Sequence, residues 1–367
     1  MSYWKCILLV KLLLVHVVCY ALVPSIPQKG SGGFIYDACC SDGPCRTPIN
    51  NPGQWISSIQ SFMPLATSPD RLYVYGGAIK QNSPLGTCSF SVNYAYSDSI
   101  AKYRVAFPNA LILAIIDATP DDVTALTVCT DTVGKSIADS LSPQICTDSH
   151  VDGVVFDLEP ADFGVGMGQY GLYKETAINF SSTPCSGEAH PNGRYFGVFS
   201  NPNNFYTRNQ WPSVEGALTG NGPNNVGFLI VGAYDVSDGT QGPTPYSRYK
   251  SSITGKLTAY TDPQSQQYHV PYTVAIPGGA SFGEYQYYAE YISPTQTNII
   301  HDYSSEVTQP GYVNLASQII ATSCLSPYYM GLDYWGWNQY VWPNRSTNNI
   351  LLPNTPNGTL TIQSCTS

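Results

Sequence analysis

Short apolar segments recur along the chain, and longer stretches with helix-compatible spacing follow them. Eight such segments occur, at residues 34–36, 72–75, 110–116, 153–158, 195–199, 227–231, 272–276 and 329–334. Several are continuous rather than alternating, a pattern typical of parallel strands that are buried on both faces. No change of composition marks a linker, so we expect one domain over residues 22–367.

The clearest helix signal follows the third apolar segment. Thr119 can cap a helix, Pro120 suits the first turn, and two aspartates then favour the positive end of the helix dipole. One face of this single helix carries apolar residues at steps of three, seven and four positions, namely Val123, Leu126, Val133 and Ile137. A weaker pattern of the same kind spans residues 312–322.

Eight strand–helix units in a chain of 367 residues predict an α/β fold, the (β/α)8 or TIM barrel with enlarged loops. The alternative is an open, doubly wound parallel sheet. That fold is disfavoured because no glycine-rich phosphate-binding fingerprint follows the first apolar segment. In a barrel, the active site lies at the carboxyl ends of the strands.

The first 21 residues have the features of a secretory signal peptide. Lys5 precedes a short apolar run, and Cys19 and Ala21 supply small residues at a cleavage site. The run is short for a membrane span, and no other run reaches the ~18 apolar residues that a span requires. We therefore expect a protein that is secreted or lumenal in the secretory and lysosomal pathway.

The chain has 11 cysteines, of which nine remain after removal of the signal. In an oxidising compartment they are expected to staple the loops with disulfides and to leave one thiol over. Neither the cysteines nor the five histidines show zinc-site spacing, so no metal or other cofactor is expected. Three Asn-x-Ser/Thr triplets agree with a secreted glycoprotein: Asn179, Asn344 and Asn357.

Charge and aromatic content narrow the choice of partners. The formal net charge is −9 and no Lys/Arg cluster occurs, which argues against nucleic acid and against an anionic membrane surface. Only 11% of residues are charged, whereas the chain has 28 Tyr and 6 Trp. Flat rings cover the apolar faces of sugars while their polar edges form hydrogen bonds. A neutral polysaccharide ligand fits this composition best, and the protein is expected to be a monomer.

The fourth apolar segment ends in closely spaced acids. Because strand residues alternate between faces, Gly153, Val155, Asp157 and Glu159 are predicted to face the barrel interior, whereas Asp152 faces the helices. Two carboxylates then converge at the carboxyl end of a buried strand, where repulsion and lost hydration are expected to raise the pKa of one of them. A neutral acid of this kind suits glycoside hydrolysis. A metal site or a structural ion pair is the alternative.

This stretch resembles the signature of glycoside hydrolase family 18, the chitinase and endo-β-N-acetylglucosaminidase family. That signature reads Asp-x-x-Asp-x-Asp-x-Glu on the fourth barrel strand. The resemblance implies that Glu159 is the general acid and that Asp157 orients the substrate acetamide. Asp152 matches the first Asp and is assigned to the substrate-binding residues. Val155 stands where the family has its middle Asp, which partners the third Asp during catalysis.

Later segments resemble the family in the same order. Tyr234 and Asp235 match a Tyr-Asp pair at the end of the sixth strand, which implies that Tyr234 binds the acetamide oxygen and that Asp235 lines the same sugar site. Asp333 and Trp335 match the eighth strand, where a Trp forms the floor of the −1 subsite, and parity places both inward. The resemblance therefore implies that both bind substrate. Residues 114–117 lack the Ser-x-Gly-Gly usual in the third strand.

The resemblance implies substrate-assisted, retaining hydrolysis of β-1,4-linked N-acetylglucosamine polymers. The 2-acetamido oxygen of the sugar attacks its own anomeric carbon, Glu159 protonates the leaving oxygen, and Asp157 with Tyr234 holds the acetamide. Two other readings stay open. Val155 favours a sugar-binding lectin that has lost turnover. A retaining hydrolase of another barrel family would use Glu159 with Glu284 as its carboxylate pair.

Overall fold

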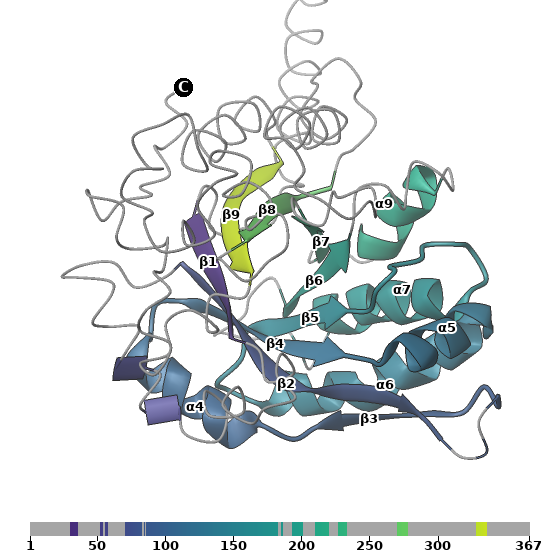
Figure 1. Ribbon diagram of the computed structural model, residues 1–367, viewed down its shortest axis with the longest axis horizontal. Helices are drawn as coiled ribbons and strands as arrows, with labels where there is room; N and C mark the ends of the chain where they lie inside the picture. Colours follow the sequence, from purple (N-terminus) through teal and green to yellow (C-terminus); the bar gives the residue numbers. More distant parts are fainter. Residues whose placement is uncertain are drawn as a thin grey trace, which may run out of the picture.

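A closed barrel of eight parallel strands forms the centre of the protein (Figure 1). The computed structural model describes residues 30–35, 52–53, 56–57, 70–82, 84, 86–182, 185, 193–200, 210–219, 227–232, 270–277 and 328–335. The barrel strands, in order, are β1 (Gly30–Ile35), β2 (Arg71–Gln81), β4 (Leu111–Asp117), β5 (Gly153–Asp157), β6 (Tyr195–Ser200), β7 (Gly227–Gly232), β8 (Tyr272–Pro277) and β9 (Tyr329–Trp335). β1 pairs with both β9 and β2, which closes the barrel. The predicted fold class and all eight predicted strands are confirmed.

Helices lie outside the strands (Figure 1). The described ones are α4 (Ser97–Ala106), α5 (Pro120–Val128), α6 (Asp131–Thr147), α7 (Gly168–Ser181) and α9 (Trp211–Thr219). Outward-facing aromatic residues of the strands pack on them: the ring centroid of Phe156 lies 5.7 Å from that of Tyr173 on α7, and that of Phe196 lies 6.4 Å from that of Phe180. The helix expected over residues 312–322 lies outside the described residues.

The helix expected after Thr119 begins where predicted but divides in two. The Thr119 hydroxyl accepts a hydrogen bond from the backbone N–H of Asp122, as an N-cap should. Cys129 and Thr130 then adopt extended backbone, with ψ of 163° and 159°, and α6 starts afresh. The prediction of one continuous helix was wrong because this break depends on distant partners: Cys129 forms a disulfide with Cys88, and Thr130 pairs with Met167.

A ninth strand, β3 (Phe90–Tyr94), was not predicted. It pairs antiparallel with the second half of β2, from Gly77 to Gln81, outside the closed barrel. Its apolar residues alternate with Ser91 and Asn93, which is the period of a half-buried strand. The prediction counted only apolar segments followed by a helical stretch, and this short hairpin strand is not of that kind.

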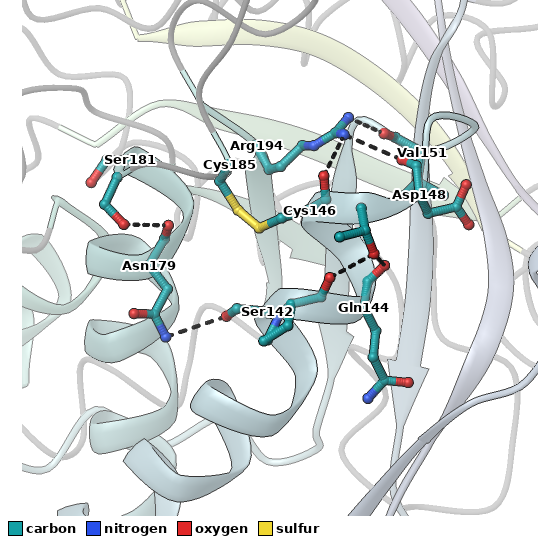
Figure 2. Close-up of a disulfide and its surroundings, with 12 residues drawn as sticks. Ser142, Gln144, Cys146, Asp148, Val151, Asn179, Ser181, Cys185 and Arg194 are labelled. Atoms are coloured by element: carbon teal, nitrogen blue, oxygen red, sulfur yellow. Dashed lines mark hydrogen bonds between the residues drawn. A yellow bond between two sulfur atoms is a disulfide. The ribbon is translucent and has the colours of Figure 1, made fainter.

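The end of the barrel opposite the carboxyl ends of the strands is tied together by a disulfide and one arginine (Figure 2). Cys146, in the last turn of α6, is bonded to Cys185, beyond the end of α7. Arg194, just before β6, donates hydrogen bonds to the backbone oxygens of Cys146, Asp148 and Val151. A cation beside the last carbonyls of a helix is favourable, so α6, β5 and β6 are joined at one point.

Two disulfides are thus described, Cys88–Cys129 and Cys146–Cys185, in agreement with the expected loop staples. The other five cysteines beyond residue 21 lie outside the described residues: Cys39, Cys40, Cys45, Cys324 and Cys365. In the part of the chain that the structure describes, no helix is both long and apolar enough to cross a membrane. The signal peptide expected over residues 1–21 also lies outside the described residues.

Candidate active site

The faces of β5 are those that strand alternation predicts. Asp152 lies on the helix side, where its carboxylate pairs with Arg104 of α4 and accepts the backbone N–H of Ile112 at 2.8 Å. Phe156 also faces the helices, in contact with Tyr173. Gly153, Val155 and Asp157 therefore face the barrel interior.

The two acids after Phe156 differ in exposure. Asp157, the last residue of β5, is 7% exposed, whereas Glu159, two residues further on, is exposed to solvent. Val155 is 0% exposed and fills the interior below Asp157. The strand edge thus presents a buried carboxyl group and, next to it, one that a ligand can reach.

A second carboxyl group, from β4, lies beside Asp157. The parallel register of β4 and β5 places Asp117 opposite Asp157. The hydroxyl of Tyr75, on β2, donates to Asp117 Oδ1 at 3.3 Å. In the sequence, Asp117 was noted only as part of a segment that departs from a family motif. The available signal was its place at the end of an apolar strand, the same place that Asp157 has on the next strand.

The loop that follows β5 is anchored by one buried amide. Gln169, at the start of α7, is 0% exposed. Its Oε1 accepts the backbone N–H of Asp162 at 3.0 Å and the Tyr173 hydroxyl at 2.8 Å. Its Nε2 donates to the Thr127 hydroxyl at 2.8 Å and to the Pro160 carbonyl at 3.2 Å. The main chain directly after the acidic pair is therefore fixed by a fully satisfied side chain.

Tyr173 completes the electrostatics on the helix side of β5. Burial raises the pKa of its phenol well above the ordinary value, and the negative charges of Asp162 and Asp157 raise it further. The hydroxyl therefore stays protonated and keeps its hydrogen bond to Gln169.

Asp333 lies in the barrel interior rather than at its mouth. It is 0% exposed on β9, and its carboxylate binds the Arg71 guanidinium and the Tyr73 hydroxyl. An added Cβ at Gly32 would lie 2.2 Å from Asp333 Oδ1, so the glycine makes room for this carboxylate. Asp333 and Asp157 stand on β9 and β5, which are not neighbouring strands in the barrel.

The remaining predicted site residues are only partly described. The backbone of Trp335 ends β9 opposite Pro277 of β8, at the carboxyl edge of the barrel. Tyr234 and Asp235 lie outside the described residues, as does Glu284. Among the residues described, no group of three or more His, Cys, Asp or Glu could hold a metal ion.

No protein-family model matches the chain, and no curated protein matches it in sequence. Solved structures resemble the fold. A glycoside hydrolase family 18 chitinase from Flavobacterium johnsoniae aligns over 86% of this chain and 90% of its own, at 12% identity and a TM-score of 0.49. A chitinase from Bacteroides thetaiotaomicron aligns over 87% of this chain and 93% of its own, at 12% identity and a TM-score of 0.47. A chitinase from Rhizomucor miehei aligns over 91% of this chain and 98% of its own, at 9% identity and a TM-score of 0.44. The fold assignment rests on the strand order and pairing.

Proposed function

We propose that the protein is a secreted glycoside hydrolase that cleaves β-1,4-linked N-acetylglucosamine polymers by substrate-assisted, retaining hydrolysis. The observation that carries the proposal is the end of β5, where Asp157 is buried and faces inward and Glu159 follows in an exposed position. The family 18 resemblance of this stretch and the chitinase-like fold support the same reading.

In this mechanism Glu159 is the general acid. Its exposed position suits contact with a glycosidic oxygen, which it protonates as the bond to the anomeric carbon breaks. The electrons that replace that bond come from the 2-acetamido oxygen of the same sugar, which gives an oxazolinium ion. Water then opens this ion from the side that the leaving group occupied and returns its proton to Glu159, so the configuration is retained.

Asp157 has a different task, which its burial suits. A carboxylate in a site with little water interacts strongly with a nearby N–H group and with positive charge. It therefore holds the acetamide in line for attack and stabilises the oxazolinium nitrogen. Tyr234 binds the acetamide oxygen, and Asp235 and Trp335 contact the same sugar.

Val155 favours a second candidate, a chitinase-like lectin. It is completely buried at the interior position where the family signature has an acid. A valine can neither accept a proton from Asp157 nor give one to it. A barrel of this kind can bind N-acetylglucosamine oligomers while turning them over slowly or not at all.

Hydrolysis of fluorogenic chitobiose and chitotriose by residues 22–367 tests the proposal. The wild type is expected to release the fluorophore, and Glu159→Gln to lower the rate at least ~100-fold because the proton donor is lost. Glu215→Gln, the same change at an exposed position of α9, serves as the control and should keep the wild-type rate.

Two outcomes contradict the mechanism. A Glu159→Gln variant with wild-type hydrolysis would exclude Glu159 as the acid. Binding of chitin oligomers by the wild type without release of reducing ends would establish the lectin. Inhibition by a thiazoline analogue of the oxazolinium ion would separate this mechanism from one with a protein nucleophile.

A further inference from the structure

The carboxyl ends of β4 and β5 place two acids side by side. The register runs from Leu113 opposite Gly153 to Asp117 opposite Asp157 without a shift. Opposite residues of neighbouring parallel strands project to the same face, with their backbones about 4.8 Å apart. Since Asp157 faces the barrel interior, Asp117 does so too.

Asp117 has a hydroxyl group on its other side. The strand before it, β2, places Tyr75 opposite Ile115, one inward-facing position below Asp117. The Tyr75 hydroxyl donates to Asp117 Oδ1 at 3.3 Å. Tyr75 in turn packs on Tyr96, with ring centroids 5.5 Å apart, so the donor is held in place. A row of hydroxyl, carboxyl and carboxyl thus crosses three neighbouring strands.

Two carboxyl groups in this arrangement cannot ionise independently. Each negative charge opposes the other, and burial of Asp157 strengthens the opposition because little water screens it. Such a pair releases its protons in two separate steps that belong to the pair rather than to either residue. Between those steps, a coupled pair of carboxyl groups holds one proton in common.

β5 alone cannot provide this sharing. The inward-facing position below Asp157 is Val155, which has no proton to exchange. We propose that Asp117 is a positioning residue of the site, which shares one proton with Asp157 and thereby orients the Asp157 carboxyl group toward the substrate acetamide. For its effect on hydrolysis the inference rests on the proposed function.

The exchange is balanced within the pair. When Asp157 takes the proton, Asp117 carries the negative charge and the Tyr75 hydroxyl stabilises it. When Asp117 takes the proton, Asp157 carries the charge that faces the oxazolinium nitrogen. Other titratable groups near this pair include Glu159, which follows β5, Tyr173 on α7, whose phenol stays protonated, and Asp162, whose charge acts on the same Tyr173.

A titration followed by NMR tests the pair without reference to activity. Residues 22–367 labelled with ¹³C at the aspartate carboxyl groups should show Asp117 and Asp157 titrating in two steps more than one pH unit apart. In Asp117→Asn, Asp157 should titrate in one step at lower pH because the neighbouring charge is gone. Asp121→Asn, the same change at an exposed position of α5, should leave the Asp157 curve unchanged.

Two independent single-step curves in the wild type would overturn the proposal, and this result needs no variant to fold. An Asp157 curve that is the same in Asp117→Asn as in the wild type would overturn it as well.

Kinetics on fluorogenic chitotriose test the positioning role. Asp117→Asn is expected to lower kcat at least tenfold, to leave KM within about twofold, and to alter the pH profile of kcat. Adding Val155→Asp to this variant should restore part of kcat, since it supplies a carboxyl partner from β5 itself. An unchanged kcat in Asp117→Asn, or no rescue by the second change, would refute the role. Should Glu159→Gln retain wild-type hydrolysis, the proposed function fails, while the NMR titration still decides whether the pair exists.

Discussion

The ion pair inside the barrel offers a direct test of how the interior is stabilised. Arg71 Nη2 lies 2.9 Å from Asp333 Oδ1, Arg71 Nη1 donates to the Met330 carbonyl at 3.1 Å, and the Tyr73 hydroxyl donates to Asp333 Oδ2 at 2.7 Å. Both charged side chains are completely buried. Burial by itself lowers the pKa of Arg71, but Asp333 raises it above the ordinary value, so the guanidinium is charged at every working pH.

Removal of one partner leaves an uncompensated charge in the interior. Asp333→Asn and Arg71→Met should each lower the free energy of unfolding by about 3–5 kcal/mol. That is a large share of the free energy of unfolding of a typical domain, which is roughly 5–15 kcal/mol. The double variant Arg71→Met with Asp333→Leu contains neither charge. The free energy of unfolding of the double variant should therefore drop by at least about 2 kcal/mol less than the two single drops added together.

Urea unfolding of residues 22–367, followed by circular dichroism with the disulfides intact, measures these changes. Lys135→Ala is the control, because it breaks an exposed ion pair with Glu175 and should cost less than about 1 kcal/mol. The reasoning would be refuted if the losses of the two single variants added up to that of the double variant. It would also be refuted if the free energy of unfolding of Asp333→Asn lay within about 1 kcal/mol of the wild-type value. A stable Asp333→Asn variant that lost sugar binding would instead support the sequence-based role of Asp333 at the substrate.

Three further outcomes test other parts of the molecule. Gln169→Leu removes all four hydrogen bonds of its amide, so urea unfolding should show a loss of about 3 kcal/mol, with Gln144→Leu on the exposed face of α6 as a near-neutral control. Burial opposes ionisation of Asp148, but hydrogen bonds from Ser97, His150 and Tyr94 outweigh it and lower its pKa. Its stabilisation is therefore present above its ordinary pKa of about 4 and lost as the pH falls below it. The stability gap between wild type and Asp148→Asn should shrink from pH 7 to pH 3, and a constant gap would contradict this. Asn179 should carry no glycan in peptide mass spectrometry of the protein made in a secreting eukaryotic host, since its amide donates to Asp139 and to Ser142. Figure 2 shows the contact with Ser142.

Local patterns were enough to predict the barrel strands. A continuous apolar run reports burial on both faces wherever it occurs, so the strands from Phe34 to Tyr334 could be read one at a time. The inward face of Asp157 followed in the same way from alternation alone. The cap at Thr119 is also local, because donor and acceptor lie three residues apart.

Features that depend on distant segments could not be predicted. α5 ends at Val128 because Cys129 is bonded to a residue 41 positions earlier in the chain. The pairing of Asp117 with Asp157 depends on the register between two strands, which apolar content does not specify. The depth of Asp333 in the barrel depends on the stagger of β9 against β1 and β2. In each case the sequence shows the reactive or charged residue but does not show which distant residue lies beside it in the fold.

Arg194 has a consequence for how the chain can change over evolution. Its guanidinium binds three backbone oxygens, and every residue type provides a backbone oxygen. Substitution of Asp148 or Val151 would therefore leave the contact chemically possible, whereas loss of the arginine would remove all three bonds together. Beside the Cys146–Cys185 disulfide, the joint at this end of the barrel thus depends on the identity of one side chain and tolerates substitution at Asp148 and Val151. A search for distant homologues should accordingly weigh this position more heavily than those whose carbonyls it binds.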